Sequence, residues 1–185
     1  LCLLLAQHPE VLMNVRAEQE QLELPTQLTP DTLKKMTYLK QVIKEVLRFV
    51  PPVVRSGSRK VVENCELGEY LVPKGWDIYY QIPETHQDSE IYNNPERFDP
   101  DRFSPERAED KQKVFSHIPF GGGIRECLGK EFARLEIKLF AALLVRDHSW
   151  QLVPGQDLER TLLPFSRPRD GLKVHFSGRY PKEKN

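Results

Sequence analysis

The residues best suited to carry out chemistry lie in one short segment, from Phe120 to Gly129, which reads FGGGIRECLG. It contains one thiol, Cys127, and one guanidinium, Arg125, and three consecutive glycines precede them. A cysteine thiolate is a soft metal ligand and a strong nucleophile, and both roles require that the thiol lose its proton. The segment therefore predicts either a metal–thiolate centre or a reactive cysteine.

The neighbouring residue types favour a thiolate that binds the metal of a flat cofactor. Glycine lets the backbone lie against a planar ring, where a side chain would collide. Arg125 is a permanent cation that can pair with a carboxylate of such a cofactor. Cys127 stands where the loop is expected to become a helix, whose positive end favours the anionic sulfur. Phe120 can shield the sulfur, and Gly129 can let the helix pack close to the loop.

Two other chemistries are compatible with a glycine-rich loop that enters a helix. A phosphate-binding loop has the pattern G-x-x-x-x-G-K-[ST], but here five residues separate Gly123 from Gly129, and Lys130 is followed by Glu131. A cysteine hydrolase needs a histidine and an orienting Asn or Asp, and no histidine in this sequence has a hydrolase-like context.

The segment fits the pattern F-x-x-G-x-R-x-C-x-G at every fixed position, and it resembles the haem-binding loop of the cytochrome P450 superfamily. The resemblance implies that the Cys127 thiolate binds the iron of heme b, iron protoporphyrin IX. It also implies that these residues bind the cofactor: Phe120, Gly123, Arg125, Cys127, Gly129 and Arg59. Arg59 lies near where many members place a second arginine for a propionate. The spacing is one residue longer than usual, so Arg55 competes for this role.

Two upstream segments resemble the same family. Glu45-Val-Leu-Arg48 is similar to its E-x-x-R motif, whose side chains share one helix face and pair. Residues 94–98, NPERF, resemble the segment that supplies a further arginine, and DPDRF at 99–103 continues the likeness. The resemblance implies a buried structural cluster of Glu45, Arg48 and Arg97. The simpler interpretation is an isolated surface pair of Glu45 with Arg48, which would contribute only ~0–1 kcal/mol to stability.

The resemblance implies a monooxygenase, an oxidoreductase that inserts one oxygen atom from O2 into a hydrophobic organic substrate. An external ferredoxin or reductase would supply electrons. The amino-acid sequence of residues 117–129 and of Thr85-His86 is most similar to that of the retinoid-hydroxylase branch and its bacterial relatives. The family's distal helix, which delivers protons to oxygen, precedes the segments found here. We therefore expect no catalytic residue beyond the haem ligand, and little or no turnover by this chain alone. The alternative is a non-catalytic truncated product that binds nothing.

Composition limits partners and compartment. The 185 residues contain 27 Lys plus Arg and 27 Asp plus Glu, so no global positive charge favours a nucleic-acid partner. Three widely spaced cysteines argue against a disulfide framework and suit a reducing compartment on the cytoplasmic side. Cys2 and Cys65 are expected to be inert. The apolar start LCLLLA is far shorter than the roughly 20 residues that span a bilayer, so we expect no membrane segment in this chain.

The remaining titratable side chains have simpler explanations. His86 and His117 have no second metal ligand at a suitable spacing, so we expect them to form hydrogen bonds, with a propionate as a further option for His117. Lys130, Arg134 and Lys138 recur at i, i+4 spacing. This spacing predicts a solvated helix face, with a basic patch for an acidic electron donor as the alternative.

Periodicity indicates the elements that must position these residues. Apolar spacing predicts helices over 9–22, from Thr37 to the stop at Pro51-Pro52, and over 128–146. Thr29-Pro30-Asp31 marks a further helix start, and Thr37 is expected to cap the helix that follows it. The stripe from Phe132 to Leu144 is expected to lie in the core.

Residues 59–82 alternate β-branched or aromatic runs with turn residues, which predicts short strands, and further strands are predicted at 150–153, 162–165 and 172–176. The sum is a mainly α fold with a small β region, the C-terminal haem-binding half of the cytochrome P450 fold. We expect residues 1–185 to form a single partial domain. The uncapped helix at Leu1 predicts that the chain is a fragment.

Overall fold

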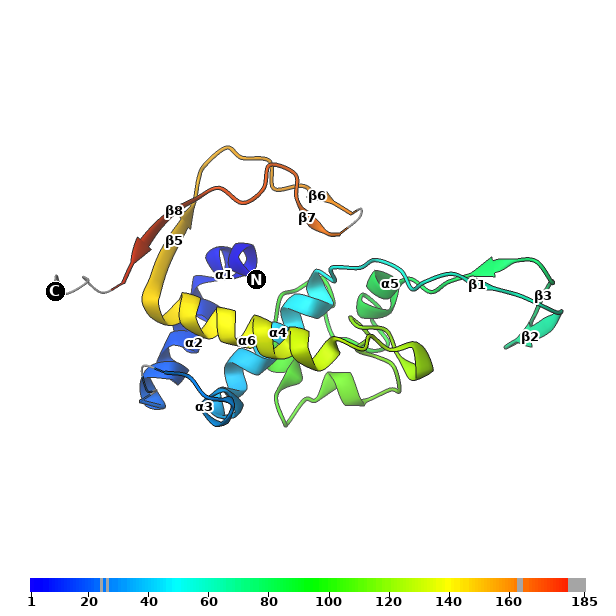
Figure 1. Ribbon diagram of the computed structural model, residues 1–185, viewed down its shortest axis with the longest axis horizontal. Coiled ribbons are helices and arrows are strands. Elements are labelled where there is room, and N and C mark those ends of the chain that lie inside the picture. Colours follow the sequence, from blue (N-terminus) through cyan, green and yellow to red (C-terminus); the bar gives the residue numbers. More distant parts are fainter. Residues whose placement is uncertain (24, 26, 163–164, 180–185) are drawn as a thin grey trace.

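The structure is a computed structural model that describes residues 1–23, 25, 27–162 and 165–179. Its helices are α1 (Cys2–Gln7), α2 (Pro9–Gln21), α3 (Pro30–Lys35), α4 (Thr37–Phe49), α5 (Ile82–His86) and α6 (Lys130–Asp147). Short 3₁₀ turns cover Pro100–Phe103, Glu109–Lys111 and Gly123–Arg125. The long helix α6 crosses α4 and contacts both α2 and α4, and these three helices form the centre of the molecule (Figure 1).

Helix α4 provides the middle of the hydrophobic core. Its apolar residues recur at the helical period and are buried: Leu39, Val42, Ile43, Val46 and Leu47. The helix ends at Phe49, two residues before Pro51-Pro52, because proline cannot continue the hydrogen-bond ladder. The predicted helix from Thr37 is therefore confirmed.

The start of α4 differs from the prediction. Helix α3 begins with Thr29 as its cap, as predicted, but the cap assigned to Thr37 is wrong. Thr37 is the first helical residue, and its hydroxyl bonds Glu18 of α2 at 3.2 Å. The same carboxylate accepts the backbone N–H groups of Tyr38 at 2.5 Å and Leu39 at 2.9 Å. An acidic side chain from a neighbouring helix thus satisfies the free amides, a role that no local pattern indicates.

Helix α6 is confirmed, but its predicted core stripe is largely wrong. The helix buries its small residues Ala141 and Ala142 together with Leu144 and Val145. The larger apolar side chains of the opposite side are 37% to 72% exposed, and we call them the apolar face of α6: Phe132, Leu135, Leu139, Phe140 and Leu143. Small residues allow close helix–helix approach, so the alanine side faces α2 and α4 and the bulky side faces solvent.

The strands that the structure describes form four separate antiparallel pairs. They are β1 (Arg59–Lys60) with β4 (Asp77–Ile78), β2 (Cys65–Leu67) with β3 (Tyr70–Val72), β5 (His148–Leu152) with β8 (Val174–Gly178), and β6 (Arg160–Thr161) with β7 (Arg167–Pro168). The first two pairs form an arm that projects from the helical body, and the pair β5–β8 lies at the opposite end of that body (Figure 1).

The strands predicted within 59–82 and at 150–153 and 172–176 are confirmed, with boundaries that shift by a few residues. The strand predicted at 162–165 falls partly on residues 163–164, which lie outside the described residues. The strands of that region flank it, at 160–161 and 167–168. The expected fold class, mainly α with a small β region, is confirmed.

Candidate functional site

The cysteine loop, residues 120–127, is closed on itself by backbone hydrogen bonds. These are Gly121 N to Ile118 O at 2.9 Å, Glu126 N to Gly123 O at 3.0 Å, and Cys127 N to Phe120 O at 2.9 Å. The last bond joins the residue that carries the thiol to the aromatic residue predicted to shield it. Helix α6 begins at Lys130, so Cys127 lies three residues before the first helical residue.

Two glycines of the cysteine loop are required by backbone conformation. Gly121 has φ +75° and Gly123 has φ +71°, a left-handed region in which side chains other than glycine are strained. Gly129 is not required by backbone conformation. A Cβ added there would meet only the Cys127 sulfur, at an ordinary contact distance of 3.9 Å. The close packing predicted as the reason for Gly129 is limited to this one contact.

The cysteine loop presents its chemical groups to solvent. Cys127 is a free, exposed thiol, and Arg125 is also exposed. Ile124 and Leu128 are fully exposed at 101% and 103%, and the apolar face of α6 begins four residues later at Phe132. A thiol that can ligate iron, a guanidinium for a carboxylate and uncovered apolar side chains fit the edge and face of a haem.

Phe120 is held from two sides. It is half-buried and packs against the hydrophobic core cluster. The guanidinium of Arg134, on α6, lies over its ring at 5.7 Å from the centroid, a cation–π arrangement. Arg134 is itself paired with Glu131 at 2.9 Å. These contacts fix the orientation of the Phe120 ring at the start of the loop.

A buried charge cluster joins α4 to the 3₁₀ turn Pro100–Phe103. Glu45, Arg48 and Arg102 are each fully buried. The Glu45 carboxylate accepts Nε and Nη2 of Arg48 at 2.7 and 2.9 Å and Nε of Arg102 at 3.2 Å. It also accepts the backbone N–H of Asp99 at 2.8 Å. The carboxylate is therefore saturated with donors, as a buried charge requires.

The second arginine of this cluster is a correction to the prediction, which named Arg97. The side chain of Arg97 is exposed, and the residue contributes only its backbone carbonyl, at 3.3 Å from Arg48 Nη2 and 3.0 Å from Arg102 Nη2. The 3₁₀ turn Pro100–Phe103 turns Arg102 inward instead. The signal was present in the sequence, because DPDRF repeats the NPERF pattern five residues later.

The cluster extends into an alternating network. Arg102 Nη1 binds Glu109 at 2.7 Å, Glu109 binds Arg107 at 2.6 Å, and Arg107 binds Asp99 at 2.7 Å. With Glu45 and Arg48, the network contains three carboxylates and three guanidiniums, so its formal charge is zero. Desolvation and the neighbouring Arg107 act in opposite directions on Asp99, and the net effect is a lowered pKa.

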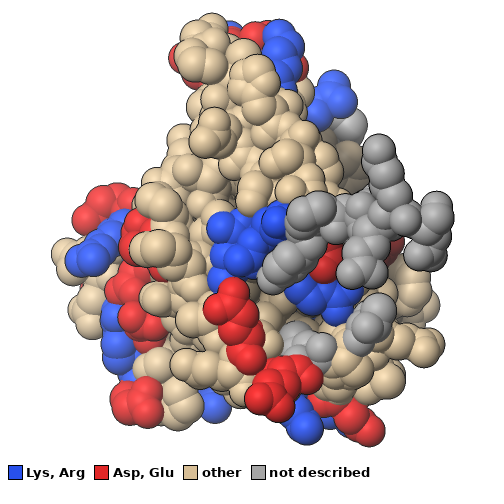
Figure 2. Space-filling model, turned by 90° about the vertical axis from the view of Figure 1, so that its left-hand side faces the viewer, with Lys and Arg blue, Asp and Glu red and all other residues tan. Residues whose placement is uncertain are grey.

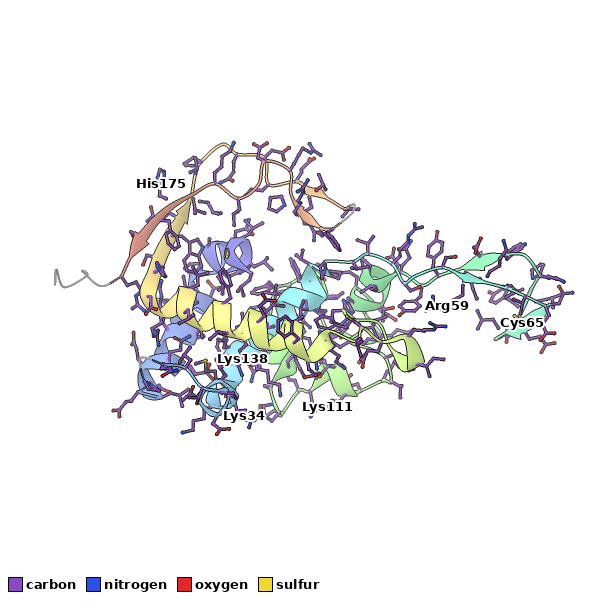
Figure 3. The ribbon with its side chains drawn as sticks, viewed as in Figure 1. Lys34, Arg59, Cys65, Lys111, Lys138 and His175 are labelled. Carbon is purple, nitrogen blue, oxygen red and sulfur yellow. The ribbon has the colours of Figure 1, made fainter. Side chains whose placement is uncertain are left out.

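Both arginines considered for a second propionate are exposed. Arg59 lies at the base of the arm (Figure 3), and its Nη1 donates to the carbonyls of Gly57 at 3.0 Å and Ser58 at 3.1 Å. The guanidinium of Arg55 lies 5.0 Å from the ring centroid of Tyr79 and lines a groove of about 710 Å³. The assignment of the propionate to Arg59 stays a prediction, with Arg55 as its competitor.

His86 and His117 are hydrogen-bonding side chains stacked on one another, with ring centroids 5.5 Å apart. His86 is fully buried, with Nδ1 3.2 Å from Arg48 O and Nε2 accepting Ile118 N–H at 3.0 Å. His117 Nε2 lies 3.1 Å from Lys44 O. Burial lowers the pKa of His86 to about 3 and that of His117 to about 4. Sequence reasoning missed that His86 connects α4 to the segment that enters the cysteine loop.

The cations on the side of α6 are mostly paired. Lys130 binds Glu126 at 2.6 Å and Arg134 binds Glu131, whereas Lys138, near the middle of α6 (Figure 3), is partly buried and its pKa is lowered by desolvation. At the end of the molecule shown in Figure 2, basic and acidic side chains also lie next to one another. These pairs favour a solvated helix face over a strongly basic patch.

Within 1–23, 25, 27–162 and 165–179, no three His, Cys, Asp or Glu side chains converge as a metal site would require. In the same part of the chain, no helix combines the length and apolar character needed to cross a bilayer.

Comparison with known proteins agrees with this geometry. The cytochrome P450 family model matches residues 1–176. Putative cytochrome P450 120 of Synechocystis is 51% identical over 173 residues, which cover 94% of this chain and 39% of that protein. Mouse cytochrome P450 26B1 is 40% identical over 182 residues, 94% of this chain and 35% of that protein. The chain thus spans about two fifths of the length of these relatives.

A solved structure, retinoic acid-bound cyanobacterial CYP120A1, superposes with a TM-score of 0.90 at 50% sequence identity. The match covers 96% of this chain and 40% of that one. The cysteine loop, the buried Glu–Arg cluster and the overall course of the chain therefore have one common explanation. This chain belongs to the cytochrome P450 family, near the retinoid-hydroxylase branch and its bacterial relatives.

Proposed function

We propose that the Cys127 thiolate is the sulfur ligand of a heme b iron, and that a cofactor site is built around it from Phe120, Gly123, Arg125, Gly129 and Arg59. The observation that carries this proposal is the closed cysteine loop, in which Cys127 N–H binds Phe120 O while the thiol stays exposed. The uncovered apolar side chains on both sides of Cys127 support it, because a porphyrin would cover them.

Haem in such a site supplies the activation of O2 and the transfer of one oxygen atom to a hydrophobic organic substrate. The residues of this chain bind and orient. Cys127 donates electron density from sulfur, Arg125 and Arg59 neutralise carboxylates, and Phe120 accepts the Cys127 N–H and so helps to hold the ligand in place. Electrons are delivered by an external ferredoxin or reductase. The monooxygenase activity belongs to the assembled enzyme, of which this chain provides the cysteine-ligand side.

The relatives support a proposal for the substrate class. The solved relative is described as bound to retinoic acid, an apolar chain with a carboxylate. We propose a hydrophobic substrate of this kind. The groove of about 710 Å³ supports it, because its walls combine apolar residues such as Phe49, Val54 and Leu162 with two arginines, Arg55 and Arg160, and one acid, Glu84.

We further propose that residues 1–185 act as a single partial domain in a reducing compartment, on the cytoplasmic side. Cys2, Cys65 and Cys127 are all free thiols, which supports that environment. The compartment also keeps Cys127 available as a ligand.

Haem titration tests the proposed ligation. The haem-supplied chain, reduced and exposed to carbon monoxide, should absorb at the long wavelength characteristic of thiolate ligation. Cys127→Ser should abolish this band. Cys65→Ser is the matched control, because Cys65 is also free and exposed but lies on the arm, and the band should persist. Identical spectra for the wild type and Cys127→Ser would contradict the proposal.

A further inference from the structure

Gly122 needs a reason other than backbone conformation. Its φ of −161° is extended, and any residue adopts that region. However, a Cβ added at Gly122 would lie 2.6 Å from Cδ1 and 2.8 Å from Cε1 of Phe115. Carbon atoms in contact lie ~3.5–4.0 Å apart. The Phe115 ring therefore occupies the space that a side chain at position 122 would need.

Phe115 reaches this place at a cost in backbone strain. Its φ is +62°, a region that a bulky aromatic residue rarely adopts. Its side chain is 60% exposed, so deep burial does not offset the strain. An exposed aromatic residue held in a strained conformation against a glycine of the functional loop points to a role in that loop.

A second aromatic residue meets the neighbouring glycine. A Cβ at Gly121 would lie 3.1 Å from the Tyr80 hydroxyl oxygen. Tyr80 comes from the segment after β4, whereas Phe115 lies five residues before Phe120, the first residue of the cysteine loop. A small cavity of about 220 Å³ lies between them, lined by Tyr80, Thr85, Phe115, Ile118 and Gly122. Two side chains from distant segments thus contact consecutive glycines.

We propose that Phe115 is a positioning residue for the cysteine ligand: its ring packs on Gly122 and fixes the path of the loop that closes at Cys127, with Tyr80 in support at Gly121. The consequence for iron ligation rests on the proposed function, whereas the effect on loop closure does not. A methyl group at position 122 and the aromatic ring at position 115 would occupy the same space, so each excludes the other.

Amide hydrogen exchange in the haem-free chain tests loop closure directly. Gly122→Ala should raise the exchange rates of the Gly121 and Cys127 amides about ten-fold, because both donate in the bonds that close the loop. Phe115→Ala alone should also raise these rates, by a smaller factor, because the ring no longer packs on the loop. The double variant Phe115→Ala, Gly122→Ala should match Phe115→Ala to within about two-fold, since the clash is removed. Amides in the middle of α4 should exchange equally in all variants.

Matched controls separate this steric effect from general ones. Gly57→Ala makes the same chemical change at a glycine whose Cβ would meet only the end of the Arg59 side chain, at 3.3 Å, and it should leave the loop amides unchanged. Val114→Ala removes an apolar side chain that is 85% exposed, next to Phe115, and it should also have no effect.

The haem-loaded chain gives a second readout. Gly122→Ala should lower the fraction of reduced, carbon monoxide-bound protein that shows thiolate ligation, Phe115→Ala should lower it less, and the double variant should match Phe115→Ala. Exchange rates in the double variant that stay at the Gly122→Ala level, or loop amides that exchange at the wild-type rate in Gly122→Ala or in Phe115→Ala, overturn the inference. Wild-type protein without a thiolate band but with the predicted exchange pattern contradicts the proposed function alone.

Discussion

At the scale of single residues, the hydrogen bonds of the His86 ring fix its protonation state. Its Nε2 accepts the Ile118 N–H at 3.0 Å, so the ring is neutral with its proton on Nδ1, which donates to Arg48 O. The backbone carbonyl of His86 accepts a further hydrogen bond, from Arg48 Nη1 at 2.7 Å. Protonation of Nε2 would break the bond to Ile118, and burial already lowers the pKa of His86 to about 3.

This arrangement predicts a loss of stability on acidification. Between the ordinary histidine pKa of 6.5 and the native value of about 3, the unfolded chain binds a proton that the native state does not. The free energy of unfolding should therefore fall with pH below 6.5, by ~1.4 kcal/mol at pH 5.5 from His86. His117, with a pKa of about 4, acts in the same direction.

Urea unfolding at pH 7.5, 6.5 and 5.5 measures this slope. His86→Gln should be less stable at pH 7.5 and should show a shallower pH dependence. Replacement of the exposed His175 by Gln is the control and should keep the wild-type slope. A wild-type free energy of unfolding that does not change over this range would refute the assignment.

A second residue-scale prediction concerns Gln19 on α2. It is only 5% exposed, and neither its amide nitrogen nor its amide oxygen has a hydrogen-bond partner among the residues that the structure describes. Burying an unpaired polar group costs ~1–3 kcal/mol, so Gln19→Met, which keeps the length and removes the polar atoms, should stabilise the chain by ~1 kcal/mol. Gln21→Met, on the same helix but exposed, should change stability by less than ~0.5 kcal/mol. Thermal unfolding compares the two, and a destabilised Gln19→Met would show that its amide is satisfied.

At the scale of the elements, the alternating charge network joins α4 to the segment after α5. Within this network Arg102 forms ion pairs with both Glu45 and Glu109. A buried pair contributes modestly compared with a well-packed apolar replacement, but removal of one partner leaves an uncompensated charge. The network thus makes the position of the 3₁₀ turn 100–103 dependent on α4.

Two variants with the same chemistry test this assignment. Arg102→Met should destabilise the chain by ~3–5 kcal/mol, because it leaves two buried carboxylates short of a donor. Arg97→Met removes an exposed side chain and should change stability by less than ~0.5 kcal/mol. Equal losses in chemical denaturation would restore Arg97 to the cluster and contradict the correction.

On the scale of the whole molecule, the apolar face of α6 and the cysteine loop are open to water. Ile124 and Leu128, on either side of Cys127, have no cover, and Phe132 is 72% exposed. Oxygen-transfer chemistry needs a site from which water is excluded. A bound cofactor would cover these side chains, but the chain spans only about two fifths of the length of its cytochrome P450 relatives.

We accordingly predict little or no product from the 185-residue chain alone. The assay supplies haem, retinoic acid and peroxide as a surrogate for the electron donor, with full-length cyanobacterial CYP120A1 as the positive control. Product formation by the chain at a rate near that of the control would contradict the prediction. Haem binding without turnover is the expected result.

The sequence by itself determined the family and the candidate ligand, Cys127. The spacing from Phe120 to Gly129 is local and covalent, and so are the E-x-x-R pair on one turn of α4 and the helical period of its apolar residues. These features depend only on neighbours within a few positions, so no tertiary information was needed to identify them. The amphipathic helices and the β region at 59–82 followed for the same reason.

Only the tertiary structure decided which side chains meet across the chain. Whether Arg97 or Arg102 reaches Glu45 depends on a 3₁₀ turn, and the capping of α4 depends on a carboxylate from α2. The outward direction of Phe132 depends on which face of α6 lies against α2 and α4, and the match of Phe115 to Gly122 depends on the folded path of the loop. Each is a contact between segments, and a pattern along one segment does not contain the position of the other.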